Sequence, residues 1–293
     1  MLPDRSPSVI TMPTSNVQLP TSNKIAFIGG GNMARSLIGG LLRTGVDAGS
    51  ISVAEPDTAL RDALQRDFNV DTQVHNAAAA EQASVIVLAV KPQVMRAVCS
   101  ELAGTVQRDK SLLLSIAAGI RMQSIAEWAG GDVAVVRCMP NTPALIGAGA
   151  SGLCANALVD EKARARCEHI LAAAGICVWI EDETHMDVVT AISGSGPAYF
   201  FLLVEALEDA AVAQGLPRDA ARTLATQTAL GAGRMLREDG EAPNRLRERV
   251  TSPNGTTQAA LDAFNAGDLR GLVASAVDAA TRRGRELAAG SGA

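Results

Sequence analysis

The sequence predicts an α/β protein in which a doubly wound parallel sheet comes first and an all-helical domain follows. Three observations carry this prediction. Apolar strand-like runs alternate with helical patterns from residue 24 to about residue 183, a glycine cluster joins the first strand to the first helix, and strand-like runs vanish from about residue 184 onward. Alternating strands and helices are typical of a parallel sheet covered on both faces. We therefore expect one domain over 24–183 and a helical domain over 184–293.

Composition fits a globular protein and excludes several classes of partner. A chain of 293 residues can bury a substantial core. Its net charge of −5 leaves no basic footprint for nucleic acid or an anionic membrane. Its 3% aromatic content argues against stacking of single-stranded bases. No apolar run of about eighteen residues is evident, so no membrane span is expected.

Cysteine usage indicates a cytoplasmic protein without a metal. The five cysteines are scattered, and neither a CxxC pair nor a Cys/His spacing typical of metal ligands occurs. We expect buried free thiols in a reducing compartment.

Residues 1–23, rich in Ser, Thr and Pro, hold no apolar run of signal-peptide length. They are interpreted as a disordered extension, or partly as an overlong start, since Met12 could initiate instead.

The first glycine cluster predicts a dinucleotide site. Residues 24–28 read as a strand, and an apolar stripe over 33–42 reads as a helix. Between them, Gly29, Gly31 and Ala34 fit the G-x-G-x-x-G/A fingerprint of the Rossmann fold. The first glycine permits the tight turn, the second lets backbone approach a pyrophosphate, and the alanine allows close packing of helix on strand. The N–H groups at the helix start would then face the anion. A purely structural glycine turn is the alternative.

The choice of cofactor is predicted to depend on Glu55. Residues 51–54 read as the second strand, and Glu55 follows it, ahead of a helix at about 58–67. A carboxylate there can accept a hydrogen bond from the ribose 2′-OH of NAD and would repel the 2′-phosphate of NADP. Its distance from the glycines is somewhat more than the roughly 20 residues of the fingerprint, and no Arg follows immediately to hold a phosphate. An exposed turn carboxylate is the alternative.

Three further strands are predicted to end on the ligand side of the sheet. Residues 84–90 form a continuous apolar run typical of a central strand, and 111–115 and 132–137 read as further strands. Ligands of an open α/β sheet bind beyond the carboxyl ends of the strands. Lys91 is therefore placed to meet a cofactor phosphate or a substrate carboxylate, unless it is simply solvated. The small residues 117–119 would let a flat ring approach.

Long helical stripes dominate the second half. After a helix over 161–173 and a short strand over 177–180, they cover 197–214, 217–238 and 257–266. These stripes exceed what one layer could bury, so we expect this domain to dimerise. Ordinary packing within the chain is the alternative.

Two breaks rich in glycine and hydroxyl groups interrupt the helices, over 192–199 and 250–257. Each places hydroxyls and free backbone N–H groups at a helix N-terminus, which suits a small anion such as a carboxylate. Simple capping by Ser and Thr is the alternative. Capping accounts for one hydroxyl but not for a packed run of them, so ligand binding is favoured at the second break.

Taken in order, six motifs give the chain a specific resemblance to pyrroline-5-carboxylate reductases, the enzymes that complete proline biosynthesis. They extend across nearly all of 24–288, and the last two together are narrow to this family. The motifs are Phe-Ile-Gly-Gly-Gly-Asn-Met-Ala (27–34), Ala-Val-Lys-Pro (89–92), Ser-Ile-Ala-Ala-Gly (115–119), Arg-Cys-Met-Pro-Asn-Thr-Pro (137–143), Ser-Gly-Ser-Gly-Pro-Ala-Tyr (193–199) and Val-Thr-Ser-Pro-Asn-Gly-Thr-Thr (250–257).

The resemblance implies a Rossmann domain, a helical dimerisation domain, and a homodimer with active sites at its interface, often assembled further into rings. It implies reduction of L-1-pyrroline-5-carboxylate to L-proline by hydride transfer from NADPH or NADH. The cofactor-binding residues that it implies are Gly29, Gly30, Gly31, Asn32, Met33, Ala34, Asn76, Ala89, Val90, Lys91, Pro92, Ala117 and Ala118. The substrate-binding residues are Ser252, Gly255, Thr256, Thr257 and Glu183. We expect the catalytic hydrogen bond to the substrate nitrogen from Thr257.

Three positions depart from the family pattern. Asn254 replaces the first glycine usual in the substrate loop, and because Asn tolerates left-handed backbone, we expect the loop to keep its shape. Glu55 stands where many relatives carry a small or basic residue, which suggests NADH in place of their usual NADPH. Arg249 stands where some relatives carry an asparagine donor and is left out of the predicted site.

The sequence leaves two alternative functions. A related Rossmann reductase could act on another imine or on a β-hydroxy acid, but hydroxy-acid members would need a lysine base on the long helix over 197–214, which has no lysine. A non-catalytic dinucleotide-sensing regulator should keep the glycine loop and lose the substrate loop, whereas both are intact here.

Overall fold

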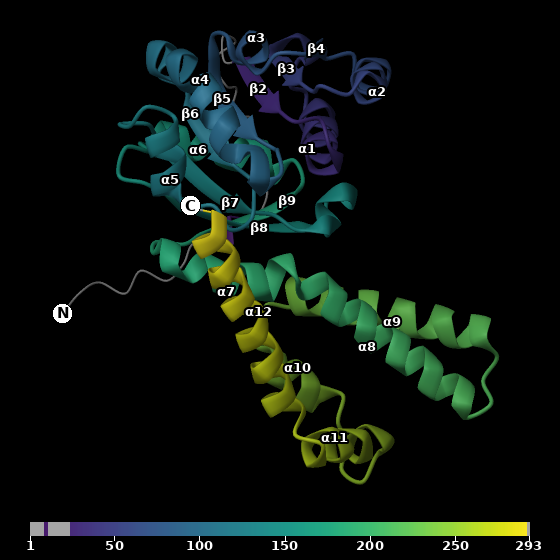
Figure 1. Ribbon diagram of the computed structural model, residues 1–293. Helices are drawn as coiled ribbons and strands as arrows, with labels where there is room; N and C mark the ends of the chain where they lie inside the picture. Colours follow the sequence, from purple (N-terminus) through teal and green to yellow (C-terminus); the bar gives the residue numbers. More distant parts are fainter. Residues whose placement is uncertain (1–8, 11–23, 292–293) are drawn as a thin grey trace. The chain divides into compact units, whose positions relative to one another are not determined.

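The computed structural model describes residues 9–10 and 24–291, which group into two compact units (Figure 1). The first unit contains the sheet, the chain up to Gly194 and the C-terminal stretch from Ala280. The second unit is Ser195–Ala279 and consists of helices. The predicted fold class, a Rossmann-type sheet followed by a helical domain, is confirmed.

A mixed sheet forms the centre of the first unit. Within the described residues it has nine strands in the order β1-β9-β8-β7-β6-β5-β2-β3-β4. The strands are β1 (Val9–Ile10), β2 (Lys24–Ile28), β3 (Ile51–Ala54), β4 (Asp71–Gln73), β5 (Ala83–Leu88), β6 (Leu112–Ser115), β7 (Val135–Met139), β8 (Gly149–Ala155) and β9 (Gly175–Trp179).

The sheet is mostly but not wholly parallel. The strands from β4 to β7 are parallel, but β8 runs antiparallel to β7, and β1 runs antiparallel to β9. The connection from Met139 to Gly149 is too short for the helical crossover that a parallel neighbour requires. Strand β8 was not predicted, because Gly-Ala-Ser-Gly-Leu-Cys-Ala has little β propensity and is extended by its tertiary context.

Helices cover both faces of the sheet, as a doubly wound fold requires. Alternate residues of β2 face opposite cores: Phe27 packs with Leu37 of α1, whereas Ile28 packs in the cluster that holds Leu102 of α4. The helices of this unit are α1 (Asn32–Arg43), α2 (Thr58–Phe68), α3 (Asn76–Ala80), α4 (Met95–Asp109), α5 (Met122–Trp128), α6 (Glu161–Ala172) and α7 (Met186–Val189).

The strand order reverses between β2 and β5, and this defines the ligand side. Backbone bonds fasten the strand ends there: the Gly29 N–H donates to the Ala54 carbonyl at 2.8 Å, and the Ala89 N–H donates to the Ile28 carbonyl at 2.8 Å. Doubly wound sheets bind ligands in the crevice at such a switch point.

The second unit is built around a pair of long helices, α8 (Gly196–Ala213) and α9 (Arg218–Glu238). Glu208 on α8 is buried and accepts hydrogen bonds from Arg218 and Arg222 on α9. The remaining helices are α10 (Pro243–Arg249), α11 (Thr256–Ala266) and α12 (Leu269–Ser291), the last of which begins in the second unit and ends in the first.

Large apolar side chains of α8 lie exposed in the single chain. Phe200, Phe201 and Leu202 each expose about two thirds of their surface. By length and composition alone, residues 183–213 could cross a membrane, although no such span was expected from the sequence. The run is broken by a stretch of π-helix over Thr190–Gly194, and exposed apolar patches of this kind also mark protein–protein interfaces.

The contact-based units divide the chain later than the predicted boundary between 183 and 184. Residues 184–194 belong with the sheet because Met186 is fully buried in its core and Asp187 is paired with Arg137 of β7. Most of the predicted extension, 1–23, lies outside the described residues. Val9–Ile10 within it forms β1, a departure from the expected disorder, because the edge of β9 offers unpaired backbone groups.

All five cysteines are buried and free, as expected. Burial raises the pKa of the Cys99 and Cys177 thiols to about 12, so they behave as small apolar groups. No cluster of His, Cys, Asp or Glu suited to a metal ion occurs among the described residues.

Two helical glycines provide a test of this packing. A Cβ at Gly40 of α1 would lie 2.3 Å from the Ala173 carbonyl oxygen, so Gly40→Ala should destabilise the protein by about 1–3 kcal/mol. At exposed Gly104 of α4 a Cβ would meet nothing within 4 Å, and Gly104→Ala should be neutral or stabilising by up to about 1 kcal/mol. Denaturant unfolding of both variants measures the difference, and equal effects would contradict the packing described.

Candidate active site

The glycine loop after β2 has the shape that a dinucleotide phosphate requires. Gly29 has a φ of +98°, and a Cβ there would lie 2.6 Å from the Ala89 carbonyl oxygen. A Cβ at Gly30 would lie 2.6 Å from Leu64. Around Gly31, by contrast, an added Cβ would meet nothing within 4 Å. Gly29 is therefore required by the neighbouring backbone, a side chain at Gly30 would displace Leu64, and Gly31 leaves open space.

The N-terminus of α1 is arranged to receive an anion. Gly31 occupies the N-cap position, no side chain among the described residues caps this helix end, and its first turn carries no acidic residue. Gly31 and Asn32 are exposed, whereas Ala34 is buried against the sheet. A helix start with open N–H groups and a positive dipole end suits the phosphates of a dinucleotide, so these residues fit the predicted cofactor.

Glu55 is a buried residue that braces the glycine loop. One carboxylate oxygen accepts from the Gly30 N–H at 2.8 Å, and the other accepts from the Asp57 N–H at 3.0 Å. The alternative of an exposed turn carboxylate is therefore wrong. The structure places a negative charge beside the loop, at the end of β3.

Sequence reasoning missed Arg61 of α2, which lies beside Glu55. Its guanidinium donates to the carbonyls of Glu55 and Pro56 at 2.7 and 2.8 Å, and to the Thr58 hydroxyl at 2.9 Å. A cation six positions after Glu55 was the available signal. Because these hydrogen bonds hold the guanidinium on the backbone and on Thr58, it braces the turn.

The other predicted cofactor residues lie at the ends of neighbouring strands. Ala89 and Val90 follow β5, and Lys91 and Pro92 begin the next turn. Lys91 is exposed and makes no ion pair with a described residue. Asn76 begins α3, where its side-chain amide donates to Glu101 at 2.8 Å. The Asn76 side chain therefore already has a partner.

The segment after β6 presents Ala118 to solvent while Ala117 is buried. The Ala117 N–H donates to the Ser115 hydroxyl at 3.4 Å, and the Ile116 N–H donates to the Leu88 carbonyl at 3.2 Å. The small residues predicted to face a ring thus lie beyond the carboxyl ends of β5 and β6.

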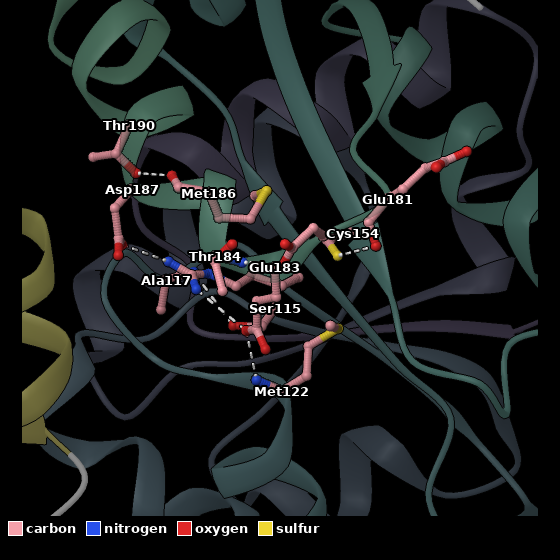
Figure 2. A network of polar contacts seen from close by, with 12 residues as sticks. Ser115, Ala117, Met122, Cys154, Glu181, Glu183, Thr184, Met186, Asp187 and Thr190 are labelled. Carbon is pink, nitrogen blue, oxygen red and sulfur yellow. Dashed lines mark hydrogen bonds and ion pairs between the residues drawn. The ribbon is translucent and has the colours of Figure 1, made fainter. Parts of the chain in front are cut away.

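Glu183, a predicted substrate residue, is half-buried and belongs to an ionic network with buried Arg137 and Asp187 (Figure 2). Its carboxylate accepts from the Met122 N–H at 2.9 Å and pairs with Arg137 at 3.2 Å. The Arg137 guanidinium also reaches Asp187 at 3.4 Å. Burial and the charge of Glu183 raise the pKa of the neighbouring Cys154 thiol, which leaves that thiol neutral.

Arg137 and Asp187 were not predicted as site residues. Arg137 is charged, yet only 3% of it is exposed. Its charge is compensated by two carboxylates, Glu183 and Asp187, which both belong to the segment that follows β9. The signal in the sequence was a single arginine within an otherwise apolar strand, where a buried charge demands partners.

The predicted substrate loop lies in the second unit at the start of α11. Asn254 adopts left-handed backbone with a φ of +58°, as expected for a residue in a glycine position. The Gly255 N–H donates to the Ser252 carbonyl at 3.0 Å, and Gly255 is the N-cap of α11 without a side-chain cap from the described residues. Ser252 and Thr256 are exposed, and Thr257 is half-buried. The loop thus joins hydroxyl groups to an uncapped helix N-terminus.

A glycine loop at the switch point of a doubly wound sheet, together with an anion-suited loop in a helical domain, defines a nicotinamide-dependent oxidoreductase class. Family models agree: residues 24–119 match "NADP oxidoreductase coenzyme F420-dependent", and residues 183–287 match "Pyrroline-5-carboxylate reductase dimerisation". The chain belongs to the pyrroline-5-carboxylate reductase family.

Similarity to known members of this family extends over nearly the whole chain. The pyrroline-5-carboxylate reductase of Pseudomonas aeruginosa is 50% identical over 265 residues, which are 90% of this chain and 97% of the relative. A solved pyrroline-5-carboxylate reductase from Coxiella burnetii is 41% identical, with a TM-score of 0.88 over 91% of this chain and 98% of that one. The Plasmodium falciparum pyrroline carboxylate reductase with NADP bound is 29% identical, with a TM-score of 0.79 over 92% and 99%.

The glycine loop yields a paired prediction. Gly31→Ala should leave the free energy of unfolding within about 1 kcal/mol, because Gly31 has a φ of −69° and open space around it. It should nevertheless weaken NADH binding about tenfold or more, since the methyl group occupies the approach of the phosphates. Gly29→Ala should lose stability by about 1–3 kcal/mol. Fluorescence titration and thermal unfolding measure both; intact binding in Gly31→Ala would contradict the assignment.

Proposed function

We propose that this protein reduces L-1-pyrroline-5-carboxylate to L-proline with a reduced nicotinamide cofactor. The observation that carries the proposal is the presence of both specific loops in one chain, over a length shared with the Pseudomonas aeruginosa reductase at 50% identity. A related hydroxy-acid reductase is not favoured, because α8 offers no lysine base. A non-catalytic sensor is not favoured either, because the substrate loop is intact.

The protein's contribution to the reaction is placement. The cofactor supplies a hydride for C5 of the cyclic imine. The open N–H groups at the start of α1 hold its phosphates, and exposed Ala118 offers a surface without bulky side chains to the ring. A protonated imine is already electrophilic, so no strong side-chain acid is needed.

The loop over 252–257 is assigned to the substrate. Its uncapped N–H groups and the hydroxyls of Ser252 and Thr256 bind the carboxylate, while the Thr257 hydroxyl hydrogen-bonds the substrate nitrogen. An anion at a helix N-terminus is stabilised by the helix dipole and by the open backbone donors.

The active form is a homodimer formed through the helical domain. The exposed Phe200, Phe201 and Leu202 of α8, together with the family match over 183–287, support this assignment. Rings of dimers, as the family resemblance implies, and a cytoplasmic location, consistent with five free thiols, belong to the same proposal.

The preferred cofactor is NADH. The Plasmodium falciparum relative was solved with NADP, so the family accommodates the 2′-phosphate. In this chain the Glu55 carboxylate stands at the end of β3 against the glycine loop, and the nearby Arg61 is committed to backbone carbonyls and Thr58. A phosphate dianion would meet the carboxylate at short range.

A spectrophotometric assay with pyrroline-5-carboxylate tests the function. Oxidation of NADH or NADPH that depends on the imine, with proline as the product, is the expected result. Absence of oxidation with either cofactor in a folded, dimeric preparation would overturn the proposal.

Thr257→Ala should lower kcat/KM by a factor of about 5 to 150, which is the effect of 1–3 kcal/mol when a polar partner is left unpaired. Thr257→Ser should recover most of the activity because it keeps the hydroxyl. Thr251→Ala is the matched control, since the Thr251 hydroxyl is committed to the Arg247 carbonyl at 2.6 Å. Steady-state kinetics give the comparison, and unchanged kcat/KM in Thr257→Ala would remove this residue from the mechanism.

Glu55→Gln should raise the ratio of kcat/KM for NADPH to that for NADH about tenfold, because it removes the charge that repels the 2′-phosphate. Asp62→Asn is the control, because it removes an exposed carboxylate from the same α2 without touching the glycine loop. A ratio that stays constant in Glu55→Gln would show that cofactor choice lies elsewhere.

A further inference from the structure

The segment between β6 and α5, residues 116–121, is fastened at both ends. At its start, the Ile116 N–H donates to the Leu88 carbonyl of β5 at 3.2 Å. Immediately after its end, the Met122 N–H donates to the Glu183 carboxylate at 2.9 Å. Between these points, Ala118 is exposed and Gly119 adopts a φ of +76°. The hydrogen bonds at the two ends, together with the close approach of Gly119 to Leu287 and Ala288 of α12, therefore hold the exposed part.

Glu183 supplies a cap that the local sequence lacks. Arg121 occupies the N-cap position of α5, and no side-chain cap is formed there by a described residue. The Glu183 carboxylate comes from 61 positions later and accepts the first N–H of the helix. A carboxylate at this position is also favoured by the helix dipole. Residues 116–121 and the segment that follows β9 are thereby joined through one oxygen atom.

Arg137 fixes the direction of that carboxylate. It projects from β7, is 3% exposed, and reaches Glu183 at 3.2 Å and Asp187 at 3.4 Å. Figure 2 shows Asp187 and Glu183 on different sides of this network, with Met122 next to Glu183. Arg137 forms an ion pair with each of the two carboxylates. Because a buried charge without its partner is costly, the ion pair with Arg137 constrains where the Glu183 carboxylate lies.

We propose that Glu183 is a positioning residue for the cofactor: held by Arg137, it sets the 116–121 segment through the Met122 amide. This inference rests on the proposed function, in which Ala117 and Ala118 contact the dinucleotide. It assigns to Glu183 a role different from the substrate contact that the family resemblance suggests. The carboxylate touches neither substrate nor cofactor and acts through the loop that does.

Substitutions at Glu183 separate these roles without exposing a bare charge. Glu183→Ala removes the cap but leaves Arg137 paired with Asp187, and Asp187→Asn leaves Arg137 paired with Glu183. Glu183→Gln keeps an oxygen acceptor for the Met122 N–H and for Arg137. Replacement of Arg137 is avoided, because it would leave two carboxylates buried together.

Glu183→Ala should raise the KM and the Kd for NADH about tenfold and lower kcat, while the KM for pyrroline-5-carboxylate stays within about twofold. Glu183→Gln should recover the cofactor affinity to within about threefold, and Asp187→Asn should match the wild type as closely. Amide hydrogen exchange of a peptide over 115–122 should accelerate in Glu183→Ala and not in Glu183→Gln. Thermal unfolding verifies that all variants are folded.

Other outcomes would overturn the proposal. A raised KM for the imine with unchanged cofactor affinity in Glu183→Ala would make Glu183 a substrate contact. Faster exchange at 115–122 with no change in the affinity for NADH would show that the cap is merely structural. An equal loss of NADH affinity in Asp187→Asn would show that the effect comes from the charge of the network and not from the cap. The Kd for NADH is measured without the imine, so this test stands even if the proposed reaction is not observed.

Discussion

The close approach of backbone at the carboxyl ends of β2, β3 and β5 is the constraint on which the first unit depends. The Gly29 N–H is bonded to Ala54, the Ala89 N–H is bonded to Ile28, and no Cβ fits between Gly29 and the Ala89 carbonyl. This contact closes the sheet at its switch point and aims the start of α1 outward. A side chain at Gly29 would have to separate two central strands.

The charged residues Glu55, Arg61 and Glu183 form hydrogen bonds with backbone groups of the neighbouring loops. Glu55 accepts from Gly30 and Asp57, Arg61 donates to the carbonyls that follow β3, and Glu183 accepts from Met122. Each of these hydrogen bonds connects a loop to a strand or a helix. The loops at the carboxyl ends of the strands therefore keep a defined shape although they contain few large side chains. Because these groups are buried or half-buried, their hydrogen bonds lose little strength to solvent.

Sequence patterns located the elements with strong periodicity and missed those that depend on context. The strands Lys24–Ile28 and Ile51–Ala54 were predicted at their observed bounds, because both are short apolar runs that contain β-branched residues. Strand β8 was missed because it consists largely of glycine and alanine and contains no β-branched residue. At the site, the glycine loop was predictable from local rules, whereas the pairing of Arg137 with Glu183 joins residues 46 positions apart and no local rule encodes it.

Hydrogen exchange with and without NADH tests the central claim most directly: the dinucleotide binds at the uncapped start of α1, beyond the switch point of the sheet. The account predicts that cofactor slows amide exchange in peptides over 29–37 and 115–122, and leaves a peptide over the second half of α4 unchanged. Unaltered exchange over 29–37 at saturating NADH would contradict it, because the backbone N–H groups assigned to the phosphates lie there.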